Sequence, residues 1–173
     1  GSGKQIYVFN SRSASVGETL IGPKIQECEE AGMDFEQTVS TVEEYIESQH
    51  TYFDLENLDT LRKNGRLTGI KSFDARALNI KPVMGSTPEG TICQLGQARG
   101  MKKALAKMVD QIVREGKATK DKILAISHCN CPERAREVER ILLDKIHVKA
   151  SFIVDTAGIS TMYANDGGII VVL

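Results

Sequence analysis

The chain has 173 residues, of which 41% are hydrophobic and 15 are glycine, so it can form a packed core and is neither disordered nor collagen-like. Its 22 Lys and Arg residues are balanced by 23 Asp and Glu residues, which gives a net charge of -1. This balance lacks the cationic excess of a general nucleic-acid or membrane-surface binder. No apolar stretch approaches the roughly 20 residues of a membrane span. We therefore expect no nucleic-acid partner and no stable membrane insertion.

The four cysteines are Cys28, Cys93, Cys129 and Cys131. They do not form the dense framework that small secreted domains use for disulfides. The pattern is typical of reduced thiols, and we expect a cytoplasmic protein.

The first 50 residues predict one strand and two helices. Residues 6–9 (Ile-Tyr-Val-Phe) have the apolar character of a short buried strand, and a Ser- and Asn-rich loop follows them. A helix is predicted over residues 18–31, with Pro23 near its regular start and Gly32 as its stop. A second helix should begin after Asp34, because Gln37 completes a capping box.

From residue 51 onwards strands and helices alternate. The clearest element is the helix over residues 101–113, where apolar residues recur at helical spacing. Strands are predicted at residues 51–55, 80–84, 91–95, 123–126, 152–154 and 169–172, and further helices at residues 57–63, 72–79 and 132–145. This order predicts an α/β protein with a mixed-sheet α+β domain over residues 51–173. Residues 4–50 would be the remnant of an N-terminal α/β domain, with its last strand and helices.

Charge is unevenly distributed along the chain. Residues 27–59 contain eleven acidic residues and no Lys or Arg, whereas residues 99–122 contain eight Lys and Arg and three acidic residues. Two solvated faces on different parts of the fold explain this pattern. The alternative is a basic docking face for an acidic partner.

The densest group of reactive side chains is His128, Cys129 and Cys131, between a predicted strand and helix. A helix N-terminus lowers the pKa of a thiol, and His with two Cys can begin a zinc site. The remaining ligands or a base cannot be assigned, so a strand-end turn is the simpler interpretation. The alternative function, a thiol- or metal-dependent protein, stays open at this point.

Two arginines lie beside glycines at element ends. Arg66 follows Gly65 in a turn, and Arg99 precedes Gly100 at the start of the 101–113 helix. A guanidinium near backbone N–H groups favours a carboxylate or phosphate. Either residue could also be a capping or exposed side chain.

Three segments together resemble the DegV family of bacterial fatty-acid-binding proteins. They are L-D-T-L-R-K-N-G-R-L-T-G at residues 58–69, L-N-I-K-P at residues 78–82 and A-R-G-M-K-K-A-L at residues 98–105. Upstream, Asn10-Ser11 and Ala14-Ser15-Val16-Gly17 are similar to the family's D-S-x-x-A-S-x-G stretch. The resemblance covers residues 5–173 and aligns with the later part of the family. We therefore expect a DegV protein that lacks most of its first domain.

The resemblance implies a non-enzymatic protein that binds a long-chain fatty acid between two domains and presents its carboxylate to a fatty acid kinase. No cofactor is expected besides the lipid ligand. The family's arginines match Arg66 and Arg99, at the headgroup and kinase-facing end. Tyr163 stands where the family has a histidine; its hydroxyl can donate to a carboxylate, but it cannot be cationic.

An acyl chain requires an apolar tunnel with polar groups at one end. Apolar strand residues are the candidates for its wall, although most of them must also form the core. These candidates are Ile80, Val83, Ile92, Leu124, Ile126, Ile153 and Ile169.

The strand predicted at residues 6–9 would lack its sheet neighbours. Such an exposed edge can pair with a second copy of the chain. The sequence thus predicts a homodimer formed through this strand edge.

Overall fold

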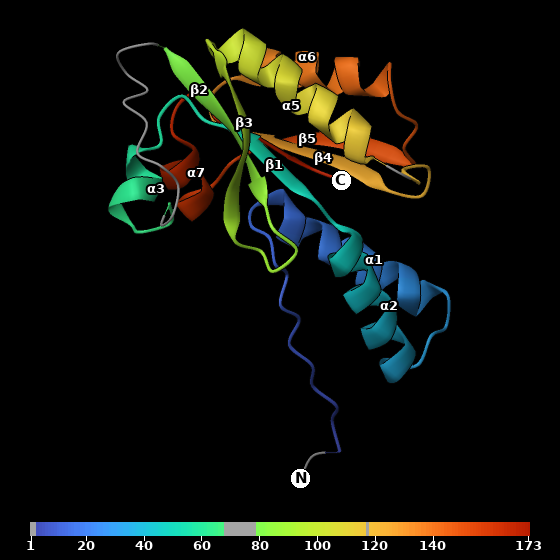
Figure 1. The fold of residues 1–173 in the computed structure, drawn as a ribbon. Coiled ribbons are helices and arrows are strands. Elements are labelled where there is room, and N and C mark those ends of the chain that lie inside the picture. The colour runs from blue at the N-terminus through green and yellow to red at the C-terminus, as the bar shows by residue number, and fades with distance from the viewer. Residues whose placement is uncertain (1–2, 68–78, 117) are drawn as a thin grey trace.

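The computed structural model describes residues 3–67, 79–116 and 118–173, and a six-stranded mixed sheet forms its centre (Figure 1). The strand order is β3-β2-β1-β6-β4-β5, in which β4 and β5 are parallel and the other neighbours are antiparallel. The strands are β1 (Thr51–Asp54), β2 (Ile80–Ser86), β3 (Ile92–Arg99), β4 (Ile123–His128), β5 (Ala150–Asp155) and β6 (Ile169–Val172). The described helices are α1 (Val16–Glu30), α2 (Phe35–Ser48), α3 (Asp59–Lys63), α5 (Met101–Glu115), α6 (Pro132–Leu143) and α7 (Gly158–Ala164). The mixed α/β fold class predicted from the sequence is confirmed.

Side chains on the two sheet faces enter different cores, because successive residues of a strand point to opposite sides. Tyr52 and Val83 face α5 and α6, together with Leu124. Their neighbours Phe53 and Met84 face the opposite side, which α3 and α7 cover in part. The described residues therefore form three layers, in which α5 and α6 cover one face of the sheet (Figure 1).

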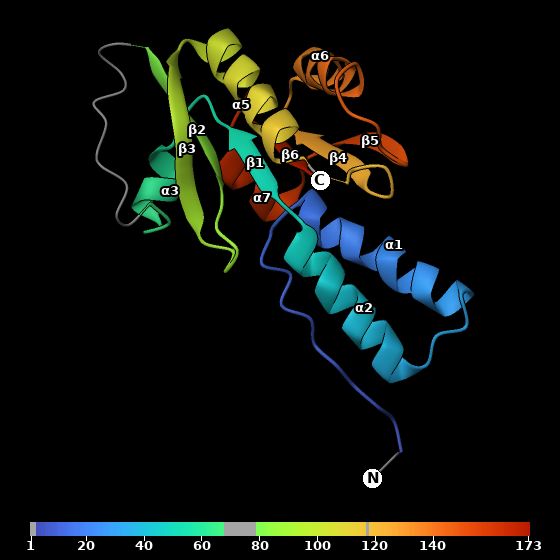
Figure 2. The same ribbon diagram turned by 45° about the vertical axis from the view of Figure 1, so that its right-hand side comes forward.

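Helices α1 and α2 form a hairpin that projects from the sheet (Figure 2). The N-terminal turn of α1 buries Val16 and Leu20 against Ala125 and Val172. The hydroxyls of Ser15 and Ser127 lie 3.0 Å apart at the same contact. Apolar packing and this hydroxyl pair thus fix the base of the hairpin to β4 and β6.

The α2 N-terminus is the capping box that the sequence predicted. The Asp34 carboxylate accepts from the Gln37 N–H at 2.9 Å, and the Gln37 side chain accepts from the Asp34 N–H at 3.0 Å. Helix α1 begins earlier than expected and continues through Pro23, which therefore does not mark its start.

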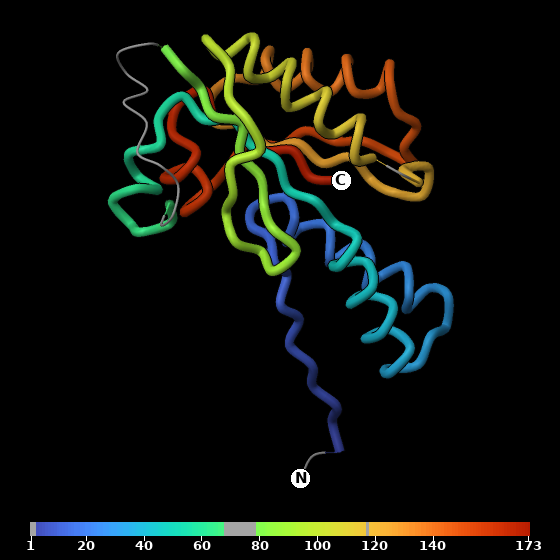
Figure 3. Tube along the Cα trace, viewed as in Figure 1, coloured from blue at the N-terminus to red at the C-terminus, as the bar shows by residue number. Residues whose placement is uncertain are grey.

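One local prediction is wrong, one helix was not predicted, and one prediction falls outside the described residues. Residues 6–9 are not a strand: they belong to an extended N-terminal segment, and the side chains of Ile6 and Val8 are 84% and 85% exposed (Figure 3). Without a neighbouring strand, apolar character alone does not form one. Helix α7 was not predicted, because only Ala164 of its residues is buried. The helix predicted at residues 72–79 falls almost entirely outside the described residues.

None of the described helices combines the length and apolar character that a membrane crossing requires.

Replacing Asp34 with Ala should lower the free energy of unfolding by about 1 kcal/mol, because the Gln37 N–H loses its acceptor. Ser40→Ala, at an exposed position inside α2, is the matched control and should leave stability within about 0.5 kcal/mol of wild type. Urea denaturation of both variants measures the difference. Equal midpoints would show that the capping box contributes nothing.

Candidate functional site

The turn between α7 and β6, residues 165–168, is where several loops meet. Asn165 ends α7 with a positive φ of 55°, and Gly167 follows with a φ of 82°. The Gly167 N–H donates to the Cys129 carbonyl at 2.8 Å, and the Cys129 N–H donates to the Gly168 carbonyl at 3.0 Å. This α7–β6 turn is therefore held against the loop between β4 and α6.

Side-chain amides fix the same turn from two further directions. The Asn165 amide donates to the Asn57 carbonyl at 3.3 Å, and the Thr60 hydroxyl donates to the Asn165 side-chain oxygen at 3.4 Å. Asn130 donates to the Asp166 carboxylate at 2.8 Å. Helix α3, the preceding loop and the β4–α6 loop thus all position the end of α7.

Tyr163 lies one residue before the end of α7, and its half-buried ring packs against an apolar cluster. Phe53 and Met84 line the cluster from the sheet, and Leu61 lines it from α3. The partly buried Ile92 also packs there. The arrangement places the Tyr163 ring against a buried apolar cluster, and a polar group beside apolar side chains is the combination that an amphipathic ligand requires.

A charged network borders the turn on the α6 side of the sheet. The Arg134 guanidinium donates through Nη1 to the Gly167 carbonyl and through Nη2 to Glu56 Oε1, the latter at 2.9 Å. Lys81 Nζ lies 2.7 Å from Glu56 Oε2. These two cations hold the pKa of Glu56 below its ordinary value although burial acts against them. Glu56 therefore stays ionised and links β2, α6 and the turn.

Asp54 is the unusual member of this region, because its side chain is fully buried at the end of the central strand β1. Neither carboxylate oxygen has a hydrogen-bond partner among the described residues. Burial raises the pKa of Asp54 to about 7, and the nearby Arg134 guanidinium opposes that rise. A carboxyl group in this environment is close to half-protonated near neutral pH.

The His128, Cys129 and Cys131 group forms no metal centre. The described residues contain no cluster of three or more His, Cys, Asp or Glu side chains that could hold an ion. His128 Nδ1 accepts the Cys131 N–H at 3.4 Å, and Cys129 packs into the apolar cluster beside Tyr163. Burial raises the pKa of the Cys131 thiol, which disfavours a reactive thiolate. The structure gives no support to the thiol or metal alternative.

The two predicted arginines occupy different places. Arg66 follows the short helix α3, which contacts α7, and its side chain is exposed. Its N–H donates to the Leu61 carbonyl at 2.9 Å, which closes the helix end. Arg99 is exposed at the end of β3 opposite Ile80, where the chain enters α5. The structure thus brings the Arg66 turn close to the helix that carries Tyr163, whereas Arg99 lies at the start of the layer on the other face.

The predicted tail residues are divided between the two faces. Ile92 packs in the cluster beside Tyr163, while Ile80 is half-buried at the start of β2. The others lie in or against the core beneath α5 and α6: Val83, Leu124, Ile126, Ile153 and Ile169. Their assignment to an acyl-chain wall stays a prediction.

Sequence reasoning missed Asn165, Arg134 and Asp54. The signal for Asn165 was weak, because Asn-Asp-Gly-Gly is an ordinary turn sequence. Arg134 looked like any other charge on a polar helix face. Asp54 interrupts an apolar strand, and that interruption was visible in Tyr-Phe-Asp-Leu.

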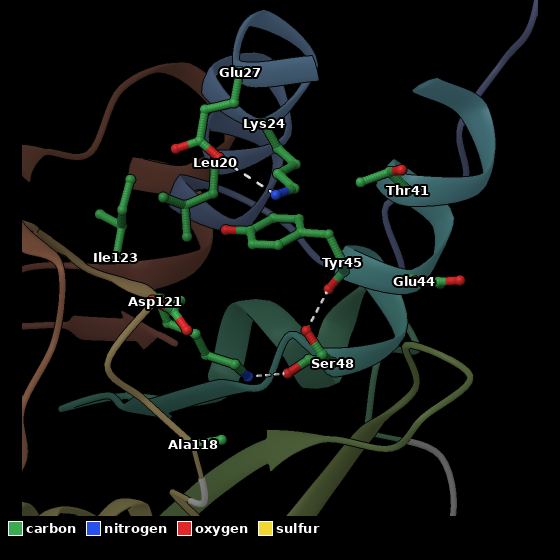
Figure 4. A pocket seen from close by; sticks show the side chains of 11 residues that line it. Leu20, Lys24, Glu27, Thr41, Glu44, Tyr45, Ser48, Ala118, Asp121 and Ile123 are labelled. Atoms are coloured by element: carbon green, nitrogen blue, oxygen red, sulfur yellow. Dashed lines mark hydrogen bonds and ion pairs between the residues drawn. The ribbon is translucent and has the colours of Figure 1, made fainter. Parts of the chain in front are cut away.

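A cavity of about 300 Å³ lies elsewhere, between α1, α2 and the start of β4 (Figure 4). Lys24 sits 5.8 Å from the centre of the Tyr45 ring and 3.3 Å from Glu27 Oε2. Lys122 donates to the Ser48 carbonyl. Both lysines of this junction cavity already have partners within the protein, so they favour a role in joining the hairpin to the sheet.

The DegV family model, described as an uncharacterised protein of that family, matches residues 2–172. The chain belongs to the DegV family. A DegV domain-containing protein of Streptococcus pneumoniae is 30% identical over 167 residues, which are 96% of this chain and 58% of that protein. The chain thus spans less than two thirds of the length of this relative.

Two solved DegV structures extend the comparison. A DegV-family protein from Ruminococcus gnavus, refined with vaccenic acid, is 71% identical with a TM-score of 0.95, over 98% of this chain and 60% of that one. The fatty acid kinase B3 protein of S. pneumoniae, loaded with linoleic acid, is 29% identical with a TM-score of 0.84, over 97% of this chain and 59% of that one. The fold of this DegV segment is therefore shared with proteins that hold fatty acids.

Gly167→Ala should lower the free energy of unfolding by roughly 2 kcal/mol. A Cβ there would lie 2.8 Å from Glu56 Cγ and 3.0 Å from Arg134 Nη1, at a positive φ. Gly158→Ala is the matched control, because Gly158 also has a positive φ but open space around it. The Gly158→Ala variant measures only the cost of placing Ala at a positive φ, about 1 kcal/mol of unfolding free energy. Equal thermal shifts in the two variants would contradict the proposed close packing of the turn.

Proposed function

We propose that this chain is the larger part of a fatty-acid-binding protein, and that it buries the acyl chain while leaving the carboxylate accessible. The single observation that carries the proposal is the position of Tyr163, whose phenol adjoins the apolar cluster of Phe53, Met84 and Ile92. The fatty acids held by the R. gnavus and S. pneumoniae proteins support it. The activity proposed is carriage rather than catalysis, in the cytoplasm and without a cofactor.

Tyr163 is proposed to donate its hydroxyl to the carboxylate, with Arg66 at the same headgroup end. The tail would lie along the apolar side chains of the α7 face, where Ile92 is the predicted tail residue that shares the cluster with Tyr163. Each buried CH₂ contributes about 0.8 kcal/mol, so the tail supplies most of the affinity and the headgroup contacts set the orientation. Most of the other predicted tail residues face α5 and α6 on the opposite side of the sheet, and their assignment to an acyl-chain wall stays a prediction.

A fatty acid kinase is the proposed partner. The name of the S. pneumoniae relative, a fatty acid kinase B3 protein, supports this assignment. The exposed cations Arg99, Lys102 and Lys103 at the start of α5 would form the docking face for an acidic surface of that kinase. Loss of binding in a triple Ala variant would support this assignment.

A homodimer is proposed through the N-terminal segment, whose side chains Ile6 and Val8 are almost fully exposed. Extended backbone with apolar side chains can pair with the same segment of another copy. Light scattering that shows only monomer at high concentration would contradict this.

The direct test of lipid binding is to extract the purified protein and identify any retained fatty acid by mass spectrometry. A delipidated sample should then bind saturated acids with an affinity that rises with chain length, by up to about fourfold per CH₂. Failure to retain or bind any acid would overturn the proposal.

Tyr163→Phe should weaken binding of a long-chain acid roughly tenfold, because a hydrogen bond to a charged group contributes about 1.5 kcal/mol. Tyr7→Phe is the control, since the Tyr7 hydroxyl bonds to Glu43 on the exposed side of α2. Calorimetric titration of both variants with oleate measures the difference. Unchanged affinity in Tyr163→Phe would remove the phenol from the headgroup site.

A further inference from the structure

The buried carboxyl of Asp54 has no role in the site described above, yet it lies beside the groups that hold the α7–β6 turn. Asp54 is directly opposite Ile169, the first residue of β6. Ile169 also pairs with His128 of β4, the strand on the other side of β6. Neither oxygen of this carboxyl has a hydrogen-bond partner in the part of the chain that the structure describes. The carboxyl lies on β1, one of the two middle strands, at the end where β6 leaves the turn.

Among the described residues, Arg134 is a charged link between the neighbourhood of Asp54 and the turn. Its two Nη groups bond to the Gly167 carbonyl, two residues before the Asp54 partner Ile169, and to Glu56, two residues after Asp54. These contacts place the guanidinium in the neighbourhood of Asp54, where its charge favours the ionised carboxyl. Gly167 has no side chain that could hold the turn in place of this contact. Any stronger acceptor near Arg134 therefore competes directly with the turn.

We propose that Asp54 is a positioning residue whose protonation state decides how firmly Arg134 holds the α7–β6 turn, and through it Tyr163. When neutral, Asp54 leaves the guanidinium on Gly167 and Glu56. When ionised, it is a buried charge without hydrogen bonds, and it draws the guanidinium towards itself because an uncompensated buried charge is costly. Ligand retention then falls as the pH rises; this consequence rests on the proposed function.

The other charged groups around Asp54 do not replace Arg134 in this role. Glu56, two residues after Asp54, is already paired with Lys81 of β2. His128 of β4 lies two strands away, with Asp155 3.5 Å from its Nδ1. The buried positions of α5 that face the sheet, Ala104 and Met108, carry no charge. The pKa of Asp54, raised by burial to about 7, places the change within the physiological range.

Hydrogen exchange tests the positioning step without any ligand. The amides of Gly167 and Cys129, both bonded across the turn, should lose roughly tenfold in protection between about pH 6 and about pH 8, after correction for intrinsic exchange. Asp54→Asn, which cannot ionise, should keep the protection at both pH values. His128→Gln is the control and should retain the wild-type loss.

Affinity for the fluorescent probe cis-parinaric acid tests the functional consequence. The affinity of Asp54→Asn is divided by that of wild type at each pH, because both proteins meet the same ionisation state of the probe. This ratio should rise roughly tenfold between about pH 6 and about pH 8. If Asp54→Asn does not fold, Arg134→Gln serves instead, because its turn should show the roughly tenfold lower protection at both pH values.

The outcomes separate the two proposals. The role of Asp54 is overturned if wild type shows no pH-dependent loss of amide protection. It is also overturned if that loss persists in Asp54→Asn or disappears in His128→Gln. Full protection of the turn in Arg134→Gln also overturns it. If the turn loses exchange protection as predicted but the protein binds no probe at any pH, the fatty-acid function is overturned and the positioning role stays intact.

Discussion

The pairing of β6 with both β1 and β4 is the constraint on which the rest of the structure depends. Strand β6 is antiparallel to both neighbours and joins two separate halves of the sheet. One half is the antiparallel set β1, β2 and β3, and the other is the parallel pair β4 and β5 around α6. Without β6 each half would expose an edge of unpaired backbone groups in the interior.

The same strand explains why the candidate site lies where it does. Because β6 must enter between β1 and β4, the preceding turn is forced against the ends of both strands, where Asn57, Cys129 and Arg134 contact it. The residue that precedes this turn by a few positions, Tyr163, is consequently set at the edge of the apolar cluster. Sheet closure and placement of the proposed headgroup donor are thus parts of one arrangement, which polar groups of two loops and of helices α3 and α6 support.

Much of the fold could be predicted from sequence, because local patterns decided it. The capping box at Asp34 and Gln37 and the apolar stripe of α5 each depend on residues a few positions apart, and both elements formed as expected. The 6–9 segment failed because a strand depends on a partner that the pattern cannot reveal. Helix α7 was missed because contacts with α3 and the β4–α6 loop stabilise it rather than a buried stripe of its own. For the site, the sequence singled out Tyr163 through the DegV resemblance, while Asp54 and Arg134 acquire meaning only from residues distant in the chain.

The central position of β6 also bears on how the protein folds. Thr51 pairs with Val172, so the two middle strands of the sheet come from opposite ends of the 51–172 segment. Closing so long a loop costs chain entropy before its contacts compensate, and such topologies fold slowly. During synthesis the β2–β3 hairpin and α5 can assemble early, but the interior edge of β1 stays open until β6 has emerged from the ribosome. The middle of the sheet is therefore the part most exposed to mispairing in a nascent chain.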